Sequence, residues 1–393
     1  MPTVPEVSPR PPRGDLLTRL EAATPQMLAD LRTLVEVESP STDPAALERS
    51  AEAVAALGRR LTGQAPARIV RGGVPHLRWD LGDGPRRVLL LGHHDTVWPL
   101  GTLASHPWSV EGGIVRGPGC FDMKAGLVLL LHAVAAVPPA YGTGVDGVTI
   151  LVTGDEEVGS TTSRSLVEDA ARGCLAALVA EGAADGGALK TARKGLAAHA
   201  VRVVGRAAHA GLEPHLGVNA GVELAHQVLA IAELGDPAAG TTVTPTLLRA
   251  GTSANTVPAS AELAVDVRAV TRAEMERVDT ALHALRPYLP GAALDVVSGH
   301  ERPPMEAGSS GGLETLAGAV ASALGLPAPG SVAVGGGSDG NFTAGVGTPT
   351  LDGLGAVGGG AHADDEHVDV DALGPRAALL AGLLAALLEG QRA

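Results

Sequence analysis

Aromatic residues and cysteines are scarce in this 393-residue sequence, which contains three Trp, two Tyr, two Phe and two Cys. Hydrophobic residues nevertheless make up 45% of the chain, so the cores must be built from the aliphatic side chains of Ala, Leu and Val. The two cysteines, Cys120 and Cys174, are too few for a disulfide framework. Free thiols are typical of a reducing compartment, and we therefore expect a cytoplasmic protein.

Basic residues are also fewer than acidic ones. Lys and Arg number 29 against 43 Asp and Glu, which gives a formal net charge of -14. Binding to nucleic acid requires a basic face, so we expect no nucleic-acid partner. No uninterrupted apolar run reaches the roughly 18 residues that a membrane-spanning helix needs, and the best candidate is 377–388. We therefore expect no membrane partner either.

Proline is concentrated at the start of the chain, with five prolines among the first twelve residues. This composition predicts a disordered leader over residues 1–13. The segment contains no apolar stretch of the kind found in signal peptides, so we expect no secretory signal. The length of the whole chain favours two or three domains.

Short apolar runs that end in polar residues recur along the chain and predict buried strands. We expect these strands at 86–92, 147–154, 174–182 and 348–356. Helical patterns are expected at about 14–37, 44–62, 124–137 and 162–172. The alternation of buried strands and helices indicates an α/β fold with a mostly parallel sheet and helices on both faces. The polar residues that follow the strands should therefore meet at the carboxyl edge of the sheet.

A different pattern occupies the middle of the chain. Strands and apolar helices follow one another in the order β-α-β-β-α-β, which is typical of a ferredoxin-like α+β domain. These segments are expected at 197–206, 217–234, 241–251, 260–270, 272–289 and 292–299. The order predicts an inserted domain at 196–302, and the main domain then consists of 14–195 together with 303–393.

Ionisable residues gather at the ends of the expected strands and in two glycine-rich loops. They are His93, Asp95, Asp122, Glu156, Glu157, Glu181 and His362. Each alone has an ordinary explanation, such as a helix N-cap for Asp122. Together they would crowd several carboxylates into one crevice, where multivalent cations relieve the repulsion. Imidazole and carboxylate ligands suit Zn²⁺, and one carboxylate shared by two ions would create a two-metal hydrolase centre.

Two of these residues suit roles beside the metal ligands. On an extended segment residues two apart face the same side, so Asp95 can orient the imidazole of His93. Glu156 lies next to the candidate ligand Glu157 and can act as the general base that takes a proton from the attacking water.

The segments GHHDTV, GPGCFDMKAG, TGDEEVGS, AEGAADG and AHADDEH occur in this order. At these residues the sequence resembles the M20 family of metallopeptidases and amidohydrolases, and within it the glutamate carboxypeptidases of the carboxypeptidase G2 type. The resemblance covers nearly the whole chain past the leader and implies a zinc-peptidase-like catalytic domain with two Zn²⁺ (or Co²⁺) ions per subunit. It also implies a cis peptide bond after the bridging aspartate. The implied ligands are His93, Asp122 and Glu181 for one ion, and Asp122, Glu157 and His362 for the other.

The resemblance also assigns roles to the inserted domain, as a lid and as the interface of a homodimer. It implies that His209 reaches the active site of the partner subunit. It further implies that Asn255, Arg268 and Arg302 bind the carboxylate of the substrate, and that Ser338 lines the cleft. A guanidinium is a planar fork that matches a carboxylate. The ordinary alternatives are a cross-strand surface pair for Arg268 and a linker charge for Arg302.

The expected substrate is a small peptide or an N-acyl amino acid with a free carboxylate, because Arg302 suits that group. The expected reaction is hydrolysis of the amide bond of a C-terminal amino acid by metal-activated water. Deacylation of the acetylornithine or succinyl-diaminopimelate type and cleavage of dipeptides are alternatives, since they use the same metals and base.

Two interpretations belong to other functional classes. The segment GLGAVG (353–358) matches the dinucleotide fingerprint GxGxxG, but no amphipathic helix is expected after it, which disfavours a nicotinamide oxidoreductase. A non-catalytic binding module on the same fold is the second alternative. The complete set of candidate ligands and the presence of Glu156 argue against it.

Overall fold

The computed structural model describes residues 15–141 and 144–389, so the predicted leader at 1–13 lies outside the described residues. The chain forms two compact units. The catalytic unit, as we name it here, contains the described residues up to Ala192, Ala307–Val334 and those from Ser338 onward. The inserted unit contains Arg193–Glu306 and Gly335–Gly337.

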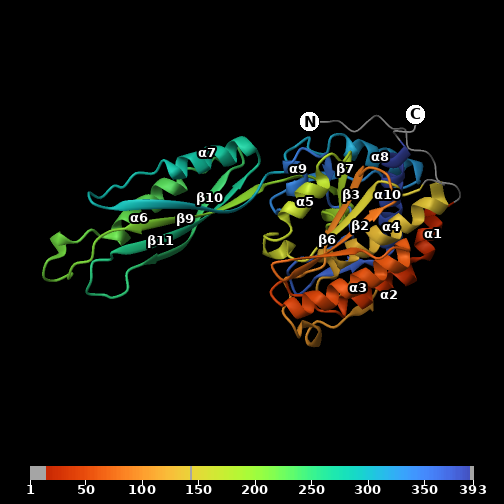
Figure 1. Cartoon of the computed structure of the whole chain (residues 1–393), viewed down its shortest axis with the longest axis horizontal. Helices are drawn as coiled ribbons and strands as arrows, with labels where there is room; N and C mark the ends of the chain where they lie inside the picture. The colour runs from red at the N-terminus through yellow and green to blue at the C-terminus, as the bar shows by residue number, and fades with distance from the viewer. Residues whose placement is uncertain (1–14, 142–143, 390–393) are drawn as a thin grey trace. The chain divides into compact units, whose positions relative to one another are not determined.

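The catalytic unit is organised around a six-stranded sheet with the order β1-β2-β6-β3-β7-β14. Figure 1 labels β2, β6, β3 and β7 of this sheet. The strands β6, β3, β7 and β14 pair in parallel, which confirms the predicted mostly parallel sheet. The antiparallel strands β1 and β2 at one edge were not predicted. The strand β1 is largely exposed and lacks a buried apolar run, whereas β2 is mostly buried. The bounds are β1 Ala67–Arg71, β2 Val74–Leu81, β3 Val88–His93, β6 Val148–Thr153, β7 Ala176–Val179 and β14 Thr350–Leu351.

Helices cover both faces of this sheet (Figure 1). One face packs against α1 (Leu16–Ala22), α2 (Thr24–Val35), α3 (Pro44–Thr62), α4 (Ala125–Tyr141), α8 (Leu313–Ala323) and α10 (Val370–Glu389). The other face packs against α5 (Arg164–Ala171) and α9 (Gly340–Gly345). The single helix predicted over 14–37 is in fact two, α1 and α2. Pro25 lies in the first turn of α2, where its missing N–H costs no hydrogen bond, but it cannot continue α1.

Local sequence signals set the ends of α3. The side chain of Asp43 accepts a hydrogen bond from the backbone N–H of Ala46, and Pro44 follows directly as the first helical residue. Gly63 ends the helix with a left-handed φ of 76°, a conformation that only glycine adopts without steric cost. The helix therefore begins and ends where the sequence predicts, within two residues.

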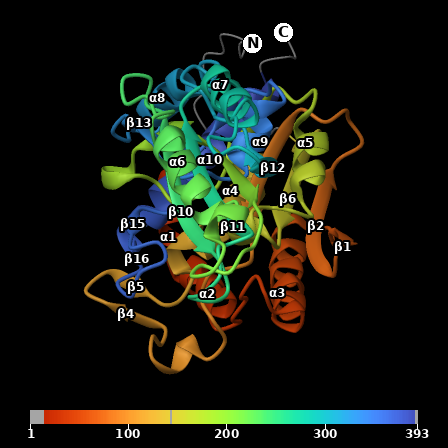
Figure 2. The same ribbon diagram turned by 90° about the vertical axis from the view of Figure 1, so that its left-hand side faces the viewer.

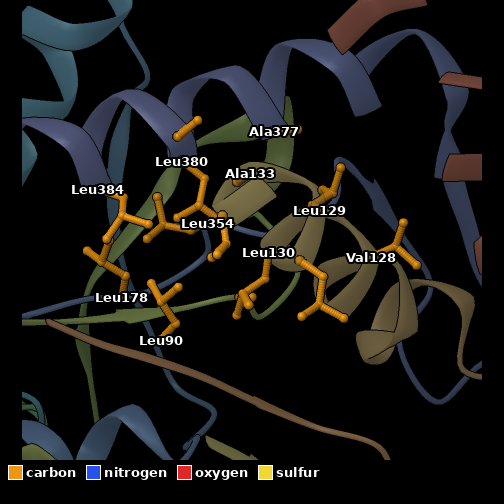
Figure 3. Packing of buried hydrophobic residues seen from close by; sticks show 14 of the residues in the cluster. Leu90, Val128, Leu129, Leu130, Ala133, Leu178, Leu354, Ala377, Leu380 and Leu384 are labelled. Carbon is orange, nitrogen blue, oxygen red and sulfur yellow. The ribbon is translucent and has the colours of Figure 1, made fainter. Parts of the chain in front are cut away.

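The core of the catalytic unit is aliphatic, as the composition predicts. Leu90 of β3 and Leu178 of β7 lie in one cluster with residues of α4 and α10, including Leu130 and Leu380 (Figure 3). All four side chains are at most 1% exposed. Complete burial of one such leucine stabilises the fold by about 1.5–3 kcal/mol. This packing fixes the two central strands, and with them the polar residues that follow their carboxyl ends.

The two most apolar helices have the length and composition of membrane spans. They are Cys120–Pro138 and Val370–Glu389, although charged residues interrupt both. However, 89% of the first segment's apolar window and 78% of the second's are buried inside the protein. Burial of this extent is typical of core helices, and it agrees with the packing of α4 and α10 against the sheet.

Two smaller sheets accompany the main sheet. Four short strands pair in the order β15-β16-β5-β4, which Figure 2 shows side by side. Their bounds are β4 Ser109–Glu111, β5 Ile114–Arg116, β15 Gly358–Gly359 and β16 His367–Asp369, while β8 (Leu189–Arg193) and β13 (Ser331–Val334) form a separate pair. Pairing of β16 with β5 brings the segment after His362 beside the loop that leads to Asp122.

The inserted unit has the predicted β-α-β-β-α-β order. Its four strands form an antiparallel sheet in the order β10-β11-β9-β12, which is the ferredoxin-like topology. The elements are β9 Gly195–Val204, α6 Ala220–Ala232, β10 Thr242–Ala250, β11 Ser260–Ala269, α7 Arg272–His283 and β12 Ala293–Arg302. Buried and exposed residues alternate along β9 and β11, and the buried ones pack against α6 and α7. The opposite face of the sheet carries the more exposed side chains.

Candidate metal centre

Three neighbouring strands of the main sheet end in ionisable residues. The strand β3 ends at His93, Glu181 follows β7 by two residues, and β6 leads into Asp155 and a short 3₁₀ helix, η3 (Glu156–Val158). Because β6, β3 and β7 are parallel neighbours, these ends lie at one edge of the sheet. The two adjacent glutamates were expected at the end of a strand. They lie instead in the 3₁₀ helix η3, so their side-chain directions do not follow the alternation of a strand.

Asp122 lies between two histidines from distant parts of the chain. Its Oδ1 is 3.3 Å from Nε2 of His93, and its Oδ2 is 3.3 Å from Nε2 of His362. Glu181 Oε1 lies 3.6 Å from the same nitrogen of His93, and Glu157 Oε2 lies 3.0 Å from that of His362. The structure therefore brings all five predicted ligands together. Their grouping around Asp122 follows the two predicted triads.

The backbone conformation of two loops positions the side chains of Asp122 and His362. Asp122 stands just before α4, and the peptide bond from Asp122 to Met123 is cis, as the family resemblance implies. His362 has a φ of 63°, in the left-handed region that non-glycine residues rarely occupy. It lies in the connection between β15 and β16, and this turn aims its imidazole at Asp122.

The electrostatics of the cluster call for positive charge. Burial lowers the pKa of His93, but the neighbouring carboxylates of Asp122 and Asp95 outweigh it and hold that pKa well above its ordinary value. Asp122 and Glu157 raise the pKa of His362 to about 10. Burial raises the pKa of Glu157, whereas the two histidines hold the pKa of Asp122 far below its usual range. Three carboxylates face two imidazoles here, an excess of negative charge that divalent cations compensate.

Two independent observations indicate that these side chains are suited to bind metal ions. Nε2 of His93 and Oε1 of Glu157 are buried and have no hydrogen-bond partner within the described residues, and such groups are costly unless something binds them. Ligand atoms of His93, Asp122 and Glu157 all lie within 4.8 Å of one another. Two ligand atoms that bind the same tetrahedral Zn²⁺, each about 2.1 Å from the ion, lie roughly 3.4 Å from one another. The separations around Asp122, from 3.0 to 3.6 Å, match that spacing.

Asp95 supports the cluster from beneath. It is fully buried, and its carboxylate lies 3.3 Å from Nδ1 of His93. The same carboxylate accepts hydrogen bonds from the backbone N–H groups of Glu156 and Glu157, each at 3.2 Å. The Ser41 hydroxyl donates a further hydrogen bond of 2.7 Å. Asp95 thus fixes both the first histidine and the turn that carries the two glutamates.

Sequence reasoning missed two supporting residues. Ser41 was overlooked because it precedes α3, far from any motif, and Glu366 because it resembles its neighbours Asp364 and Asp365. The structure separates the three acids, since Glu366 is 3% exposed and its two neighbours are exposed. No local signal distinguishes a buried acid from solvated ones within such a run.

The glycines of GLGAVG serve close packing rather than dinucleotide binding. A Cβ on Gly355 would lie 2.2 Å from the carbonyl oxygen of Ala180 and 2.7 Å from that of Glu181, so only glycine fits against the end of β7. Arg376 of α10 donates hydrogen bonds to the carbonyls of Gly353, Gly355 and Gly187. The segment after these glycines is β15, not a helix, which removes the oxidoreductase alternative.

The predicted substrate residues of the inserted unit occupy different settings. His209 and Asn255 are exposed neighbours, since Ala210 N–H donates to the Asn255 carbonyl at 2.9 Å. Arg268 of β11 is half-exposed and pairs with Asp266 at 2.9 Å, and Arg302 at the end of β12 is only 4% exposed. In the catalytic unit, Ser338 is fully buried and its hydroxyl donates to Asp352 at 2.6 Å. The proton of the Ser338 hydroxyl is therefore donated within the protein, and the same oxygen accepts a hydrogen bond from the backbone N–H of Gly340 at 3.1 Å.

Comparisons with known proteins bear on the whole chain. The family model described as peptidase family M20/M25/M40 matches residues 89–386. The chain belongs to this family. Carboxypeptidase G2 from Pseudomonas sp. (strain RS-16) is 34% identical over 392 residues, which cover 94% of this chain and 92% of that protein.

Two further comparisons widen this picture. A succinyl-diaminopimelate desuccinylase from Thioalkalivibrio sulfidiphilus (strain HL-EbGR7) is 29% identical over 333 residues, 78% of this chain and 85% of that protein. The crystal structure of aminopeptidase PepT from Bacillus cereus ATCC 10987 matches the fold with a TM-score of 0.74 at 21% identity, covering 93% of this chain and 98% of that one. Membership in the family identifies the protein as a hydrolase with a metal-binding site, and the alternative of a non-catalytic binding module is disfavoured accordingly.

Proposed function

We propose that the protein is a two-metal carboxypeptidase that hydrolyses the amide bond of a C-terminal amino acid in a small peptide or an N-acyl amino acid. The observation that carries this proposal is the position of Asp122, whose two carboxylate oxygens face two different histidines. One carboxylate shared in this way is suited to hold two ions. His93 and Glu181 would complete one site, and Glu157 and His362 the other.

Nitrogen and carboxylate ligands with three protein groups per ion favour Zn²⁺, with Co²⁺ as a substitute. When bound, the ions would polarise the scissile carbonyl and make the attacking water more acidic. Glu156 is the residue suited to accept the proton of that water and to return it to the leaving amine. Its backbone N–H is held by Asp95, and the residue is partly exposed, so it is accessible to a substrate.

The substrate class is supported by the similarity to carboxypeptidase G2, which spans 94% of this chain. A terminal carboxylate of the substrate would bind to Arg302 or Arg268, whose guanidinium groups match its planar geometry. The second candidate function is deacylation of the succinyl-diaminopimelate type, which the desuccinylase relatives favour.

The test is a substrate screen with protein loaded with Zn²⁺ or Co²⁺. We expect hydrolysis of N-acyl amino acids and dipeptides that have a free C-terminal carboxylate, and much slower hydrolysis of the matching C-terminal amides. Equal rates on acids and amides would contradict the carboxypeptidase proposal and favour a general deacylase. A chelator-treated sample serves as the control for metal dependence.

We also propose a homodimer that forms through the inserted unit. The strand β10 lies at an edge of its sheet, and its residues Leu247 and Leu248 are 63% and 53% exposed. Leu229 and Val222 of α6 are 69% and 45% exposed. An unpaired strand edge beside exposed apolar side chains is a liability that two-fold pairing of identical subunits would remove.

His209 is proposed to act in the active site of the partner subunit. Its Nδ1 accepts hydrogen bonds from the backbone N–H groups of Gly211 and Leu212, both at 3.1 Å. The ring proton must then be on Nε2, which makes this exposed histidine a hydrogen-bond donor. A donor of this kind would stabilise the oxyanion that develops during amide hydrolysis. We further propose a cytoplasmic location, which the two free, buried cysteines support.

A further inference from the structure

Glu366 is an acid buried in the catalytic unit, four residues after the ligand His362. Its side chain is 3% exposed, and its two carboxylate oxygens accept four hydrogen bonds. Oε2 accepts from the indole Nε1 of Trp98 at 2.7 Å and from the backbone N–H of Gly119 at 2.8 Å. Oε1 accepts from the backbone N–H groups of Phe121 at 2.8 Å and of Asp122 at 3.0 Å.

These four donors come from two loops that carry metal ligands. Trp98 follows the end of β3 and the ligand His93, while Gly119, Phe121 and Asp122 form the turn that presents the bridging carboxylate. Glu366 itself follows the loop that carries His362. One carboxylate therefore joins the three ligand-bearing loops, and one of its bonds is made to the backbone of the bridging aspartate.

The surrounding strands hold Glu366 in this position. The strand β16 begins directly after it and pairs with β5, which leads into the turn at Gly119. The guanidinium of Arg116 donates to the carbonyl of Asp365 at 3.1 Å, next to Glu366. A backbone anchored on both sides keeps the carboxylate aimed at these donors. The hydrogen bonds from the backbone N–H groups of Gly119 and Phe121 are buried, so water cannot readily replace the carboxylate there.

We infer that Glu366 is a positioning residue for the metal centre, which sets the distance between Asp122 and His362 through the backbone of both loops. The inference rests on the two-metal centre proposed above, but it does not depend on which amide bond is cleaved. Groups that orient metal ligands typically contribute about 10–100-fold to metal affinity or activity. Asp95 contacts the side chain of the ligand His93 as well as backbone N–H groups. Glu366 instead acts on the ligand-bearing loops through the Trp98 indole and through backbone N–H groups alone.

The decisive variant is Glu366→Gln, which keeps the size of the side chain. Its amide group would direct N–H atoms at two of the four donors, so about half of the bonds are lost. Glu366→Asp keeps the charge but shortens the side chain by one methylene. Asp364→Asn is the matched control, since it removes the same charge two residues away from a side chain that is 88% exposed.

The experiment measures the affinity of the metal-free protein for Zn²⁺ by chelator competition, and records the visible absorption spectrum of the Co²⁺ form. We expect Glu366→Gln to weaken Zn²⁺ binding about 10–100-fold and to change the Co²⁺ spectrum. Glu366→Asp should fall between this variant and the wild type, and Asp364→Asn should match the wild type. Unchanged affinity and spectrum in Glu366→Gln, with only a lower melting temperature of the metal-free protein, would overturn the inference and assign Glu366 a purely structural role.

Trp98→Phe is the second variant, for the case that Glu366→Gln fails to fold. It removes one of the four donors and keeps the aromatic ring, so we expect a smaller loss of Zn²⁺ affinity, about 2–10-fold. No loss in this variant would count against the inference. A wild-type protein that binds neither Zn²⁺ nor Co²⁺ would instead overturn the proposed function, and the inference with it.

Discussion

Nδ1 of His93 lies 3.3 Å from the carboxylate of Asp95 and 3.0 Å from its backbone carbonyl. Both contacts are made by the nitrogen opposite the one that faces Asp122, so Asp95 fixes the ring orientation and leaves Nε2 as the ligand atom. Because the same carboxylate also holds the turn at Glu156, one buried acid links a metal ligand to the proposed general base.

Asp95→Asn should weaken Zn²⁺ binding about 10–100-fold and lower kcat, because the imidazole of His93 loses its orienting partner. The measurement is chelator competition on the metal-free protein, combined with kinetics on the metal-loaded protein. Asp83→Asn is the matched control, since Asp83 is exposed on a loop of the same unit. Equal affinities of Asp95→Asn and the control would exclude the orienting role.

Adjacent glutamates should respond differently to the same substitution. Glu156→Gln is expected to retain its metal and to lose kcat by about 10²–10⁴-fold, because the general base is removed. Glu157→Gln should instead lower the metal stoichiometry, since it removes a ligand of His362's site. Mass spectrometry of bound metal and kinetics of the metal-loaded variants distinguish the two results. Near-normal kcat in metal-replete Glu156→Gln would place the base elsewhere.

The inserted unit should lose stability in acid through Glu274. Hydrogen bonds from Arg277 and Thr241 hold the pKa of Glu274 at about 2, below its ordinary value of 4.5. A depressed pKa means that the stabilisation is fully present above pH 4.5 and is lost as the pH falls toward 2. Thermal melting of the wild type and of Glu274→Gln between pH 6 and roughly 2.5 checks this, and the wild type should show the steeper decline. Parallel curves would contradict the prediction.

Exposed apolar residues of β10 should control the oligomeric state. Leu247→Glu places a charge on the edge strand and is expected to shift the protein from dimer to monomer, because the charge would be buried at the two-fold interface. Light scattering of the purified proteins measures the mass. Val70→Glu is the control, since Val70 is 55% exposed on β1 of the catalytic unit. A monomeric wild type would refute the proposed dimer.

Complementation tests whether His209 acts on the partner subunit. His209→Ala and Glu156→Gln should each be inactive as homodimers. After subunit exchange, one site of each mixed dimer combines a native Glu156 with a native His209 from the other subunit, and activity should partly return. Confirmed exchange without recovery of activity would assign His209 a role within its own subunit or none.

Arg302→Lys is expected to raise KM for substrates with a free carboxylate by about 10–100-fold, because a bidentate guanidinium contact is lost. KM for the matching C-terminal amides should change little. The same comparison with Arg268→Lys shows which of the two arginines binds the carboxylate. Equal effects of Arg302→Lys on acids and amides would argue against a carboxylate clamp.

Much of the architecture could be predicted because the signals are local. Apolar runs such as the one before His93 indicate buried parallel strands, and the polar residues that end them must lie at one edge of the sheet. The βαββαβ order of the inserted unit could likewise be predicted, because each strand and helix has its own local pattern of apolar residues. The strands β1, β4 and β5 escaped prediction, because exposed or very short strands carry no such periodicity.

The sequence by itself determined which residue types could hold metal ions and roughly where they would meet. Only the tertiary structure decided how they are held. Glu366 bonds to the backbone of Asp122 across 244 residues, and Ser41 bonds to Asp95 across 54. Such bonds depend on the packing of whole strands and helices and leave no periodic trace in the chain, so a buried acid among solvated ones becomes visible only when the distant segments are brought together.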